Sequence, residues 1–427
     1  MKIISITRIP GYKFIEKLLS VIDERWGECY LVGGAIRDYF LDRSSCDLDF
    51  VVQRREDFLA RKFANSIGGK FFILGEGKER VSRVVLRTND KVWKFDFTVF
   101  RGNDIFDDLE KRDFTINALA VSIINERFID LFDGILDIKR RIINPITRTV
   151  FVDDPLRILR AFRLSYSLSF FISHSTYELI KKDKVLLRRV SGERIRDEFF
   201  ELLKVPNFPD ALLELYREEV IKILFPSLIY DYELCKRYKI LIANEVGKRF
   251  PTFRNELSSY LLRNTSANRK KKEILKLALL FLFLSQEEYM NYLDFLRLTR
   301  QEVKGIGAII SQTRRFLKEG KPSLENLFSL PLYVQDELPG VALLLYLFDK
   351  ISVSFEILDI YYKKLLYGRG LPRFIDGNIL QERWGIPKGP LIKEVLDKVR
   401  IAQIEGKIST REDAERFVDN LVKDLTL

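Results

Sequence analysis

The 427-residue chain is 47% hydrophobic and carries a net charge of +11, which predicts packed cores in more than one domain and a polyanionic partner. Its one histidine, His174, excludes His-based triads and polyhistidine metal sites, and its three cysteines lack metal or redox spacing. The apolar run that ends at 281–284 is too short to cross a bilayer, and Met1–Ser5 lacks the apolar core of a signal peptide. We therefore expect a soluble cytoplasmic protein that does not associate with membranes.

The first 140 residues predict a mixed sheet with helices. Helical periodicity covers 12–25, 35–41 and 55–67, and strand-like runs cover 30–32, 46–52, 70–74, 80–86, 91–100, 128–131 and 141–143, with a hairpin turn at 88–90. Past Asp153 the strand-like alternation fades, and helical periodicity takes over from 155–168, 175–187, 193–203 and 208–216 to the end. The sequence therefore predicts an α+β head followed by an all-α neck, body and tail.

The stretch from Tyr30 to Gln53 holds the strongest chemical signal. Gly33 and Gly34 interrupt a strand and open a helix, so backbone N–H groups can approach a phosphate closely. Asp47 and Asp49 are two apart on the next strand and share a face, where their charges repel unless a divalent cation neutralises them. Each feature alone is common in loops and solvated strands, but together they indicate phosphoryl or nucleotidyl transfer.

The run from Gly33 to Asp38, followed by Asp47-Leu48-Asp49, resembles the first motif of the tRNA nucleotidyltransferase and bacterial poly(A) polymerase family, within the polymerase-β-like nucleotidyltransferases. The resemblance is dense over 28–205 and recurs at 371–420. It implies a catalytic head at 1–140, a helical neck at 141–205 that reads the incoming base, and a tRNA-binding body at 206–340 and tail at 341–427. It also implies nucleotide contacts from Gly33, Gly34, Arg37 and Asp38.

Asp96 is the candidate for a third carboxylate. Its strand neighbours Phe95 and Phe97 point to the opposite face, whereas Lys94 and Thr98 share the face of Asp96. From these residues alone, Asp96 is a solvated position on a half-buried strand. The family has an acidic residue here, so the resemblance implies that Asp96 joins the metal site or activates the primer hydroxyl. It further implies two Mg²⁺ ions on Asp47 and Asp49.

A second family motif spans 111–118. The resemblance implies that Arg112 neutralises triphosphate charge and that Asp113 accepts a hydrogen bond from a ribose hydroxyl, with Asn117 in the same site. A helix start capped by Asp113 or Thr115 is the structural alternative, and both roles can hold together. Lys111 departs from the family, which often has Arg at this position.

The third motif begins at Asp153, where the family commonly has Glu. Asp154 can cap the helix that follows, and three arginines recur at every third position along it, namely Arg157, Arg160 and Arg163. They could be a solvated basic face. The resemblance instead implies that all four line the nucleotide site, with Asp154 and Arg157 offering hydrogen bonds to C or A in place of a template.

Other segments resemble the family less specifically. The charged segment 191–198 resembles one that supports the base-reading helix. From 251 to 321 there are 14 Lys and Arg against 7 Asp and Glu, a net charge of +7. Solvated helix faces would explain this charge, but it also suits tRNA backbone contact. The candidate contacts are two clusters in this region and one tail residue, namely Lys270, Lys271, Lys272, Arg314, Arg315 and Lys388.

One difference from the family bears on its products. A flexible loop usually precedes the second motif, and full CCA-adding enzymes use it when they switch to ATP, whereas here only 101–108 remains. This favours a CC-adding enzyme that transfers C residues from CTP to the 3′ end of tRNA and releases pyrophosphate. Full CCA addition with CTP and ATP, A addition, poly(A) synthesis and a non-catalytic RNA-binding module stay open. The partners are tRNA and CTP, with ATP as the alternative, and no obligate protein partner is evident.

Overall fold

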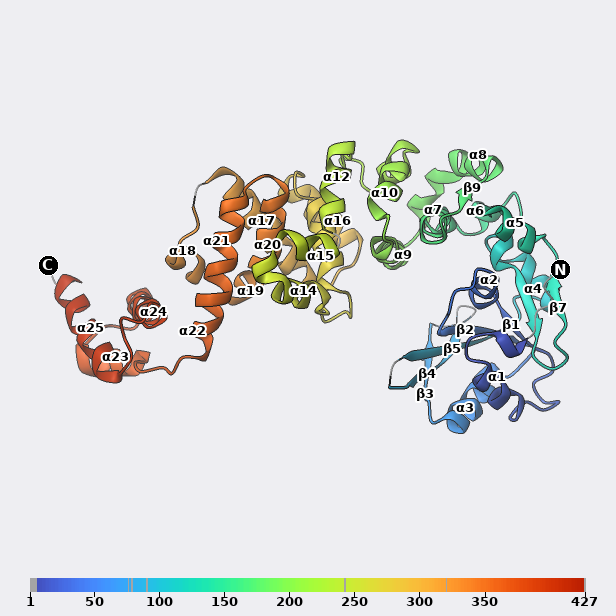
Figure 1. Cartoon of the computed structure of the whole chain (residues 1–427), viewed down its shortest axis with the longest axis horizontal. Coiled ribbons are helices and arrows are strands. Elements are labelled where there is room, and N and C mark those ends of the chain that lie inside the picture. The colour runs from blue at the N-terminus through green and yellow to red at the C-terminus, as the bar shows by residue number, and fades with distance from the viewer. Residues whose placement is uncertain are drawn as a thin grey trace. The chain divides into compact units, whose positions relative to one another are not determined.

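A computed structural model describes residues 6–75, 77, 80–89, 91–241, 243–319 and 321–425 of the chain (Figure 1). The chain divides into two compact units, one made of 1–211 with 217–224 and the other of 212–216 with 225–427. The first unit contains the predicted head and neck together with 206–211 and 217–224 of the predicted body, and the second contains the rest of the body and the tail. Met1–Ser5 and Asp90 of the predicted hairpin turn lie outside the described residues.

The head is built on a mixed sheet. In the described residues it has seven strands in the order β3-β4-β5-β2-β1-β6-β7. The strands are β1 (Cys29–Val32), β2 (Asp47–Val52), β3 (Lys70–Leu74), β4 (Val81–Arg87), β5 (Val92–Val99), β6 (Leu119–Ser122) and β7 (Phe128–Asp130). β2 and β5 pair in parallel, and the other pairings in this sheet are antiparallel. The predicted α+β class is confirmed.

Two amphipathic helices, α1 (Tyr12–Leu19) and α3 (Glu56–Ile67), bury one face of this sheet. The ring of Phe14 in α1 lies 5.2 Å from that of Phe95, and Phe63 of α3 lies 5.1 Å from Phe95 and 5.7 Å from Phe97. Both helices lie along the same side of the strands in Figure 1. Because alternate strand residues point to opposite faces, these buried aromatics fix which β5 side chains reach the open face.

Helices dominate the rest of the first unit. The elements are η1 (Ile6–Arg8), α2 (Gly34–Phe40), α4 (Ile105–Glu110), η3 (Thr115–Asn117), α5 (Gly134–Arg140), β8 (Ile142–Ile143), α6 (Val150–Asp153), α7 (Arg157–Leu168), β9 (Phe171–Ile172), α8 (His174–Asp183), η4 (Lys184–Arg189), α9 (Gly192–Lys204), α10 (Phe208–Arg217) and α11 (Val220–Leu224). α7 packs against α9, which positions the third motif over the head.

In the part that the structure describes, the second unit consists of helices and connecting loops, with one isolated antiparallel bridge between Asn264 and Lys270. Its elements are α12 (Tyr232–Ile240), α13 (Ala243–Arg249), η5 (Pro251–Phe253), α14 (Arg254–Leu262), α15 (Lys271–Leu280), α16 (Gln286–Phe295), α17 (Arg300–Lys318), α18 (Leu324–Phe328), α19 (Leu332–Gln335), α20 (Leu338–Leu347), α21 (Ile351–Asp359), η6 (Ile360–Leu365), α22 (Leu366–Gly370), α23 (Gly377–Trp384), α24 (Pro390–Ile404) and α25 (Arg411–Leu425). None of the described helices is long and apolar enough to cross a membrane.

Two local predictions were wrong. The first helix ends at Leu19 instead of Arg25, because Asp23 accepts hydrogen bonds from the backbone N–H and the guanidinium of Arg25 and so makes a turn. Strand β6 was missed: all four of its residues are buried, so it lacks the alternation that marks a half-exposed strand.

Candidate active site

Three carboxylates share the open face of the sheet. Asp49 of β2 and Asp96 of β5 are register partners in the parallel pair, and Asp47 stands opposite Lys94. Lys94 Nζ lies 3.5 Å from Asp47 Oδ1. Register partners point to the same face, so the sheet brings together the carboxylates that the sequence singled out.

The surroundings of Asp49 disfavour the ionised form of its carboxyl group. Its side chain opens into a cavity but is closely surrounded by protein, and this desolvation, with the nearby Asp96 and Asp47 carboxylates, raises the pKa of Asp49 to about 6. The guanidinium groups of Arg112 and Arg160 oppose part of this rise. An uncompensated carboxylate of this kind is what a divalent cation stabilises.

The donor set fits Mg²⁺, which in proteins is often bound through one or two carboxylates together with substrate phosphates. Asp47 and Asp49 provide two carboxylates. Among the described residues, no group of three or more Asp, Glu, His or Cys side chains is arranged to hold a metal ion. The remaining ligands would therefore come from water and the substrate.

Gly33 lets the backbone pass close to this site. Its φ is +72°, and a Cβ added there would lie 3.1 Å from Arg112 Nη1 and 3.7 Å from Asp49 Oδ2. A side chain at this position would strain the backbone and crowd the groups that border the cavity. The glycine turn therefore keeps space open between Asp49 and Arg112.

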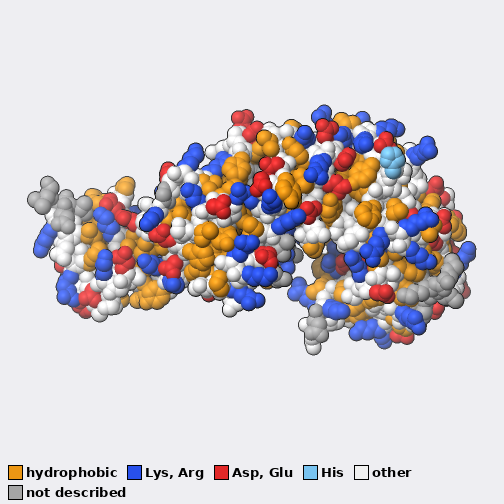
Figure 2. Space-filling view, turned by 45° about the horizontal axis from the view of Figure 1, so that its top comes forward, with side chains coloured by type: hydrophobic (Ala, Val, Ile, Leu, Met, Phe, Trp, Pro, Cys, Tyr) orange, Lys and Arg blue, Asp and Glu red, His pale blue; other side chains and the backbone are white. Residues whose placement is uncertain are grey.

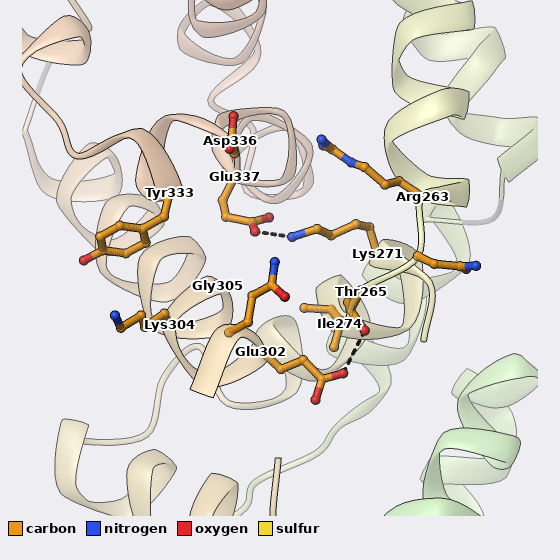
Figure 3. Close-up of a pocket in the computed structure, with 12 residues that line it drawn as sticks. Arg263, Thr265, Lys271, Ile274, Glu302, Lys304, Gly305, Tyr333, Asp336 and Glu337 are labelled. Atoms are coloured by element: carbon orange, nitrogen blue, oxygen red, sulfur yellow. Dashed lines mark hydrogen bonds and ion pairs between the residues drawn. The ribbon is translucent and has the colours of Figure 1, made fainter. Parts of the chain in front are cut away.

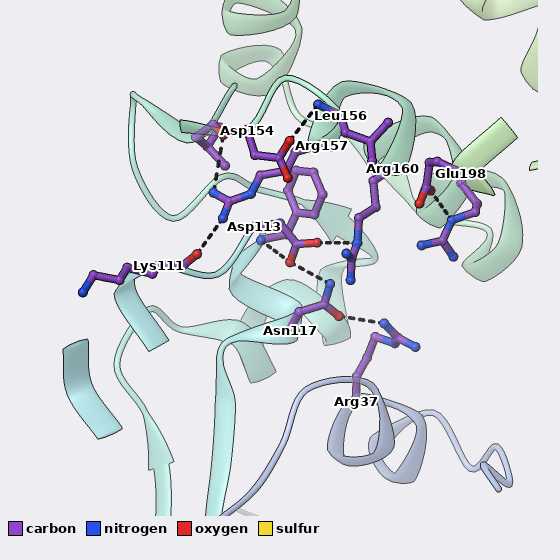
Figure 4. Close-up of polar contacts among 12 residues, drawn as sticks. Arg37, Lys111, Asp113, Asn117, Asp154, Leu156, Arg157, Arg160 and Glu198 are labelled. Atoms are coloured by element: carbon purple, nitrogen blue, oxygen red, sulfur yellow. Dashed lines mark hydrogen bonds and ion pairs between the residues drawn. The ribbon is translucent and has the colours of Figure 1, made fainter. Parts of the chain in front are cut away.

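A hydrogen-bonded network links the first and second motifs (Figure 4). Arg37 Nη1 donates to Asn117 Oδ1 at 2.7 Å, and Asn117 Nδ2 donates to Asp113 Oδ1 at 2.9 Å. Arg160 Nε forms an ion pair with Asp113 Oδ2 at 2.7 Å. Burial favours protonation of Asp113, but Arg160, Asn117 and the Phe114 N–H together keep its pKa below the usual value. Asp113 thus orders Asn117 and Arg160, and its predicted contact with ribose stays a prediction.

The guanidinium group of Arg112 is fixed by the carboxylate of Asp108. Asp108 is fully buried and accepts hydrogen bonds from Arg112 Nε at 3.1 Å and Nη2 at 2.9 Å, while its other oxygen accepts the Arg101 N–H at 3.1 Å. A buried carboxylate needs such partners. Helix α4, which carries Asp108, therefore fixes Arg112 at the edge of the cavity.

The third motif contributes a second set of fixed charges. Asp154 Oδ1 accepts the Leu156 N–H at 3.2 Å, and Asp154 Oδ2 lies 2.8 Å from Arg194 Nη2 of α9. Arg157 donates to the carbonyl of Lys111 at 2.6 Å (Figure 4). These bonds orient Asp154, in the turn after α6, and Arg157, the first residue of α7, toward the same cavity.

An open cavity of about 680 Å³ joins all three motifs. Its lining consists mainly of guanidinium groups, carboxylates and the glycine turn: Gly33, Gly34, Ala35, Arg37, Asp38, Ser45, Asp47, Asp49, Arg101, Arg112, Asp113, Asn117, Asp154, Arg157, Arg160, Arg163, Leu164 and Arg194. Every residue predicted to bind nucleotide borders it. Arg163 also pairs with Glu198 of α9, so its charge is partly used within the neck.

Four features of the site differ from the expectation or add to it. Asp96 lies beside Asp49 but does not line the cavity, because Arg83 engages both of its oxygens. Arg101 and Arg194 do line it, although the sequence placed them only in the short loop and in a supporting segment. Ser45 also lines the cavity, and the sequence analysis did not predict this. Its position just before the Asp pair is the feature that could have indicated it.

The predicted RNA-binding residues fall into three groups. Lys271 pairs with the buried Glu337, and Arg314 donates to the carbonyl of Leu282 at 2.7 Å, so both charges are used inside the second unit. Lys272 and Arg315 have acidic neighbours on their own helices, at 3.7 and 3.1 Å. Lys270 and Lys388 are exposed. On the face drawn in Figure 2, basic side chains mingle with acidic and apolar ones and form no single continuous stripe.

A smaller pocket in the second unit, of about 160 Å³, has a charged lining in which Glu337 and Glu302 are already paired (Figure 3). Glu337 accepts from Lys271 and from the Tyr260 hydroxyl at 2.9 Å. Glu302 accepts from Thr265 at 2.9 Å and Arg269 at 3.0 Å. These buried pairs join α14, α15, α17 and the chain before α20, so they stabilise the helical packing.

Comparison with known proteins supports the same assignment. Residues 29–144 match a family model described as "Poly A polymerase head domain", and 169–231 match "Probable RNA and SrmB- binding site of polymerase A". A CC-adding tRNA nucleotidyltransferase from Geobacter sulfurreducens is 41% identical over 186 residues, which cover 44% of this chain and 43% of that relative. Another from Synechocystis is 27% identical over 92% of this chain and 93% of its own length. A CCA-adding enzyme from Staphylococcus aureus is 25% identical over 95% and 97%.

Solved structures share the fold along almost the whole chain. An apo CCA-adding enzyme matches with a TM-score of 0.69 and 24% identity over 97% of this chain and 95% of that one. The Thermotoga maritima CCA-adding enzyme complexed with tRNA matches with a TM-score of 0.58 and 23% identity over 95% and 98%. The fold is therefore that of the CCA-adding enzymes. Over residues 29–144 the chain is similar to poly(A) polymerase head domains, and its relatives include CC-adding and CCA-adding tRNA nucleotidyltransferases.

Proposed function

We propose that the chain is a template-independent tRNA nucleotidyltransferase that adds C residues from CTP to the 3′ end of tRNA. The observation that carries this proposal is the Asp47–Asp49 pair beside a cavity lined by arginines from three motifs. The names of the relatives from Geobacter sulfurreducens and Synechocystis support the substrate.

The arginines of the cavity would bind the triphosphate. Arg37, Arg112 and Arg160 are each fixed by a carboxylate or an amide, so little side-chain entropy is lost when they contact phosphate oxygens. Positioning and charge stabilisation are the main contributions a protein makes to phosphoryl and nucleotidyl transfer.

In the reaction, the 3′-hydroxyl oxygen of tRNA forms a bond to the α-phosphorus of CTP while the bond to the bridging oxygen of the β-phosphate breaks. Pyrophosphate leaves, and the hydroxyl proton passes to solvent or a nearby base. Asp47 and Asp49 would hold Mg²⁺, which lowers the pKa of the attacking hydroxyl and offsets charge on the triphosphate. Arg112 would face the same phosphates from the opposite side of the Gly33 turn.

Base choice would rest on Asp154 and Arg157. Asp154 offers acceptor oxygens, and Arg157 offers a planar set of donors whose direction is fixed by the Lys111 carbonyl. Arg194 holds the Asp154 carboxylate from α9. Such a rigid donor and acceptor pair can read a base edge without a nucleic-acid template.

CC addition is supported by the segment that precedes the second motif. Asn103 N–H donates to Asp107 at 2.8 Å, and Asp107 N–H donates to Asp104 at 3.0 Å, so α4 begins at Ile105 after a tight turn. No long loop is present there to reach over the cavity. Full CCA addition is the second candidate, because the Staphylococcus aureus CCA-adding relative aligns over 95% of this chain.

The test is incorporation of labelled CTP into tRNA that ends at the discriminator base, with Mg²⁺ present. We expect extension by the native chain and none by the Asp47→Ala variant. A native chain that extends poly(A) from any RNA primer, or extends none, would overturn the proposal.

A further inference from the structure

Arg83 of β4 stands next to the catalytic carboxylates, and no sequence motif singled it out. It is the register partner of Asp96 in the antiparallel pair β4–β5, and Asp96 is in turn the register partner of Asp49. The three residues therefore form one row across adjacent strands on the open face of the sheet. On the other side of Arg83, the row ends with Phe72 of the edge strand β3.

The contact between Arg83 and Asp96 is bidentate. Arg83 Nε donates to Asp96 Oδ1 and Nη2 donates to Asp96 Oδ2, both at 2.7 Å. The planar guanidinium matches the two carboxylate oxygens, which fixes the orientation of the carboxylate as well as its position. Asp96 is therefore engaged on both oxygens, whereas Asp47 keeps a distant lysine contact of 3.5 Å.

This contact changes the expected role of Asp96. A carboxylate with both oxygens engaged by Arg is a poor metal ligand and a poor base, because either role requires breaking a charge-assisted bond. Without Arg83, Asp96 would also add an uncompensated negative charge beside Asp49 and Asp47, which would raise the affinity of this face for a divalent cation.

Resting on the function proposed above, we propose that Arg83 is a positioning residue of the catalytic centre. It holds Asp96 in one orientation beside Asp49 and offsets its charge, so that Asp47 and Asp49 alone bind the divalent cation. Asp96 is then a carboxylate of fixed orientation beside Asp49, with its charge offset by Arg83.

The test begins with Mn²⁺ titration of the full chain, followed by electron paramagnetic resonance, with neither nucleotide nor RNA present. Arg83→Met keeps the length of the side chain and removes the charge, so Mn²⁺ binding should tighten threefold or more. Adding Asp96→Asn to this variant should return the affinity to within about twofold of wild type. Unchanged or weaker Mn²⁺ binding by Arg83→Met would overturn the proposal.

The chain offers a matched control in Arg80→Met. Arg80 pairs with Asp57 at 2.9 Å, and the two side chains are 37% and 24% exposed, against 33% and 21% for Arg83 and Asp96. Because Arg80 lies outside the carboxylate row, its loss should leave Mn²⁺ affinity unchanged. A shift as large as that of Arg83→Met would show a general stability effect and refute the positioning role.

A second variant separates orientation from charge. Arg83→Lys keeps the positive charge but cannot engage both oxygens, so Mn²⁺ affinity should stay near wild type while kcat for CTP incorporation falls tenfold or more at a similar KM. Wild-type kcat in this variant would contradict the orienting role. Because the Mn²⁺ titration uses no substrate, a wrong nucleotide or acceptor in the proposed function would leave that result intact.

Discussion

Asp47, Asp49 and Asp96 lie on one sheet face, yet each has a different electrostatic environment. Asp47 is exposed and near Lys94, Asp96 is paired with Arg83, and Asp49 carries a pKa of about 6. Division of roles among neighbouring carboxylates by their surroundings is common in active sites. These differences support the proposal that the Asp47 and Asp49 pair binds the metal ion.

The first prediction concerns this pair. Asp47→Ala or Asp49→Ala should reduce CTP incorporation below detection, while tRNA affinity, measured by filter binding, stays within about threefold because basic residues elsewhere supply it. Incorporation close to the wild-type rate in either variant would contradict the metal assignment.

The second prediction uses the raised pKa of Asp49. A folded-state pKa of about 6 lies above the usual 3.8, so folding favours the protonated form. The cost in stability of ionising Asp49 begins above about pH 4 and is complete above about pH 6. Asp49→Asn should therefore raise the Tm of the chelator-treated protein at pH 8. The gain should shrink between pH 6 and pH 4, where wild-type Asp49 takes up its proton. An equal gain at both ends of this range would contradict the burial account.

At the scale of elements, helix α4 holds the residues at one edge of the cavity in place. Its buried Asp108 connects the Arg101 backbone to the Arg112 side chain, so helix and motif form one rigid piece. Loss of one partner in such a buried pair leaves an uncompensated charge.

The third prediction is that Asp108→Ala lowers the free energy of unfolding by about 3 kcal/mol and raises KM for CTP, because Arg112 loses its anchor. Chemical denaturation and steady-state kinetics measure the two effects. Asp107→Ala is the control: Asp107 lies on the same helix and bonds a loop N–H, so its loss should cost about 1 kcal/mol and leave KM unchanged. Equal effects of the two variants would refute the anchoring role.

Helix α7 and the turn before it carry the fourth prediction. Asp154→Ala or Arg157→Ala should reduce discrimination between CTP and non-cognate triphosphates more than it weakens triphosphate binding. Loss of one hydrogen-bonding group costs about 1–3 kcal/mol, or roughly 5- to 150-fold in selectivity. Competition assays with CTP and UTP measure this ratio, and slower turnover with unchanged selectivity would mean that the helix is structural.

The sequence predicted elements well where hydrophobic periodicity is strong. The strand Lys70–Leu74 agrees at both ends, and the paired aspartates of β2 and the helix of the third motif agree within two residues. Periodicity does not report hydrogen bonds between distant residues. The Arg83–Asp96 pair depends on the register of β4 and β5, and Arg194 reaches Asp154 only through the packing of α9 on α7. The sequence also could not tell that Lys271 and Arg314 would be used inside the second unit.

At the scale of the whole molecule, the chain joins a nucleotide site in its first unit to a helical second unit. Its charge of +11 fits a polyanionic acceptor. Some of the basic residues are consumed by internal pairs, so affinity for tRNA would come from many exposed groups such as Lys270 and Lys388. We propose that the short 101–108 segment limits which nucleotides are added.

The most direct measurement is the sequence of the 3′ end that the native chain makes on tRNA ending at the discriminator base, with Mg²⁺, CTP and millimolar ATP. Segment 101–108 is held in a tight turn by hydrogen bonds, so it contains no longer loop that could contact the cavity and favour a state that accepts adenine. A population shifts between two states only when something interacts differently with each of them. We predict that the product gains two C residues and then stalls. Efficient addition of A to tRNA already ending in CC would contradict CC specificity and make the chain a CCA-adding or A-adding enzyme.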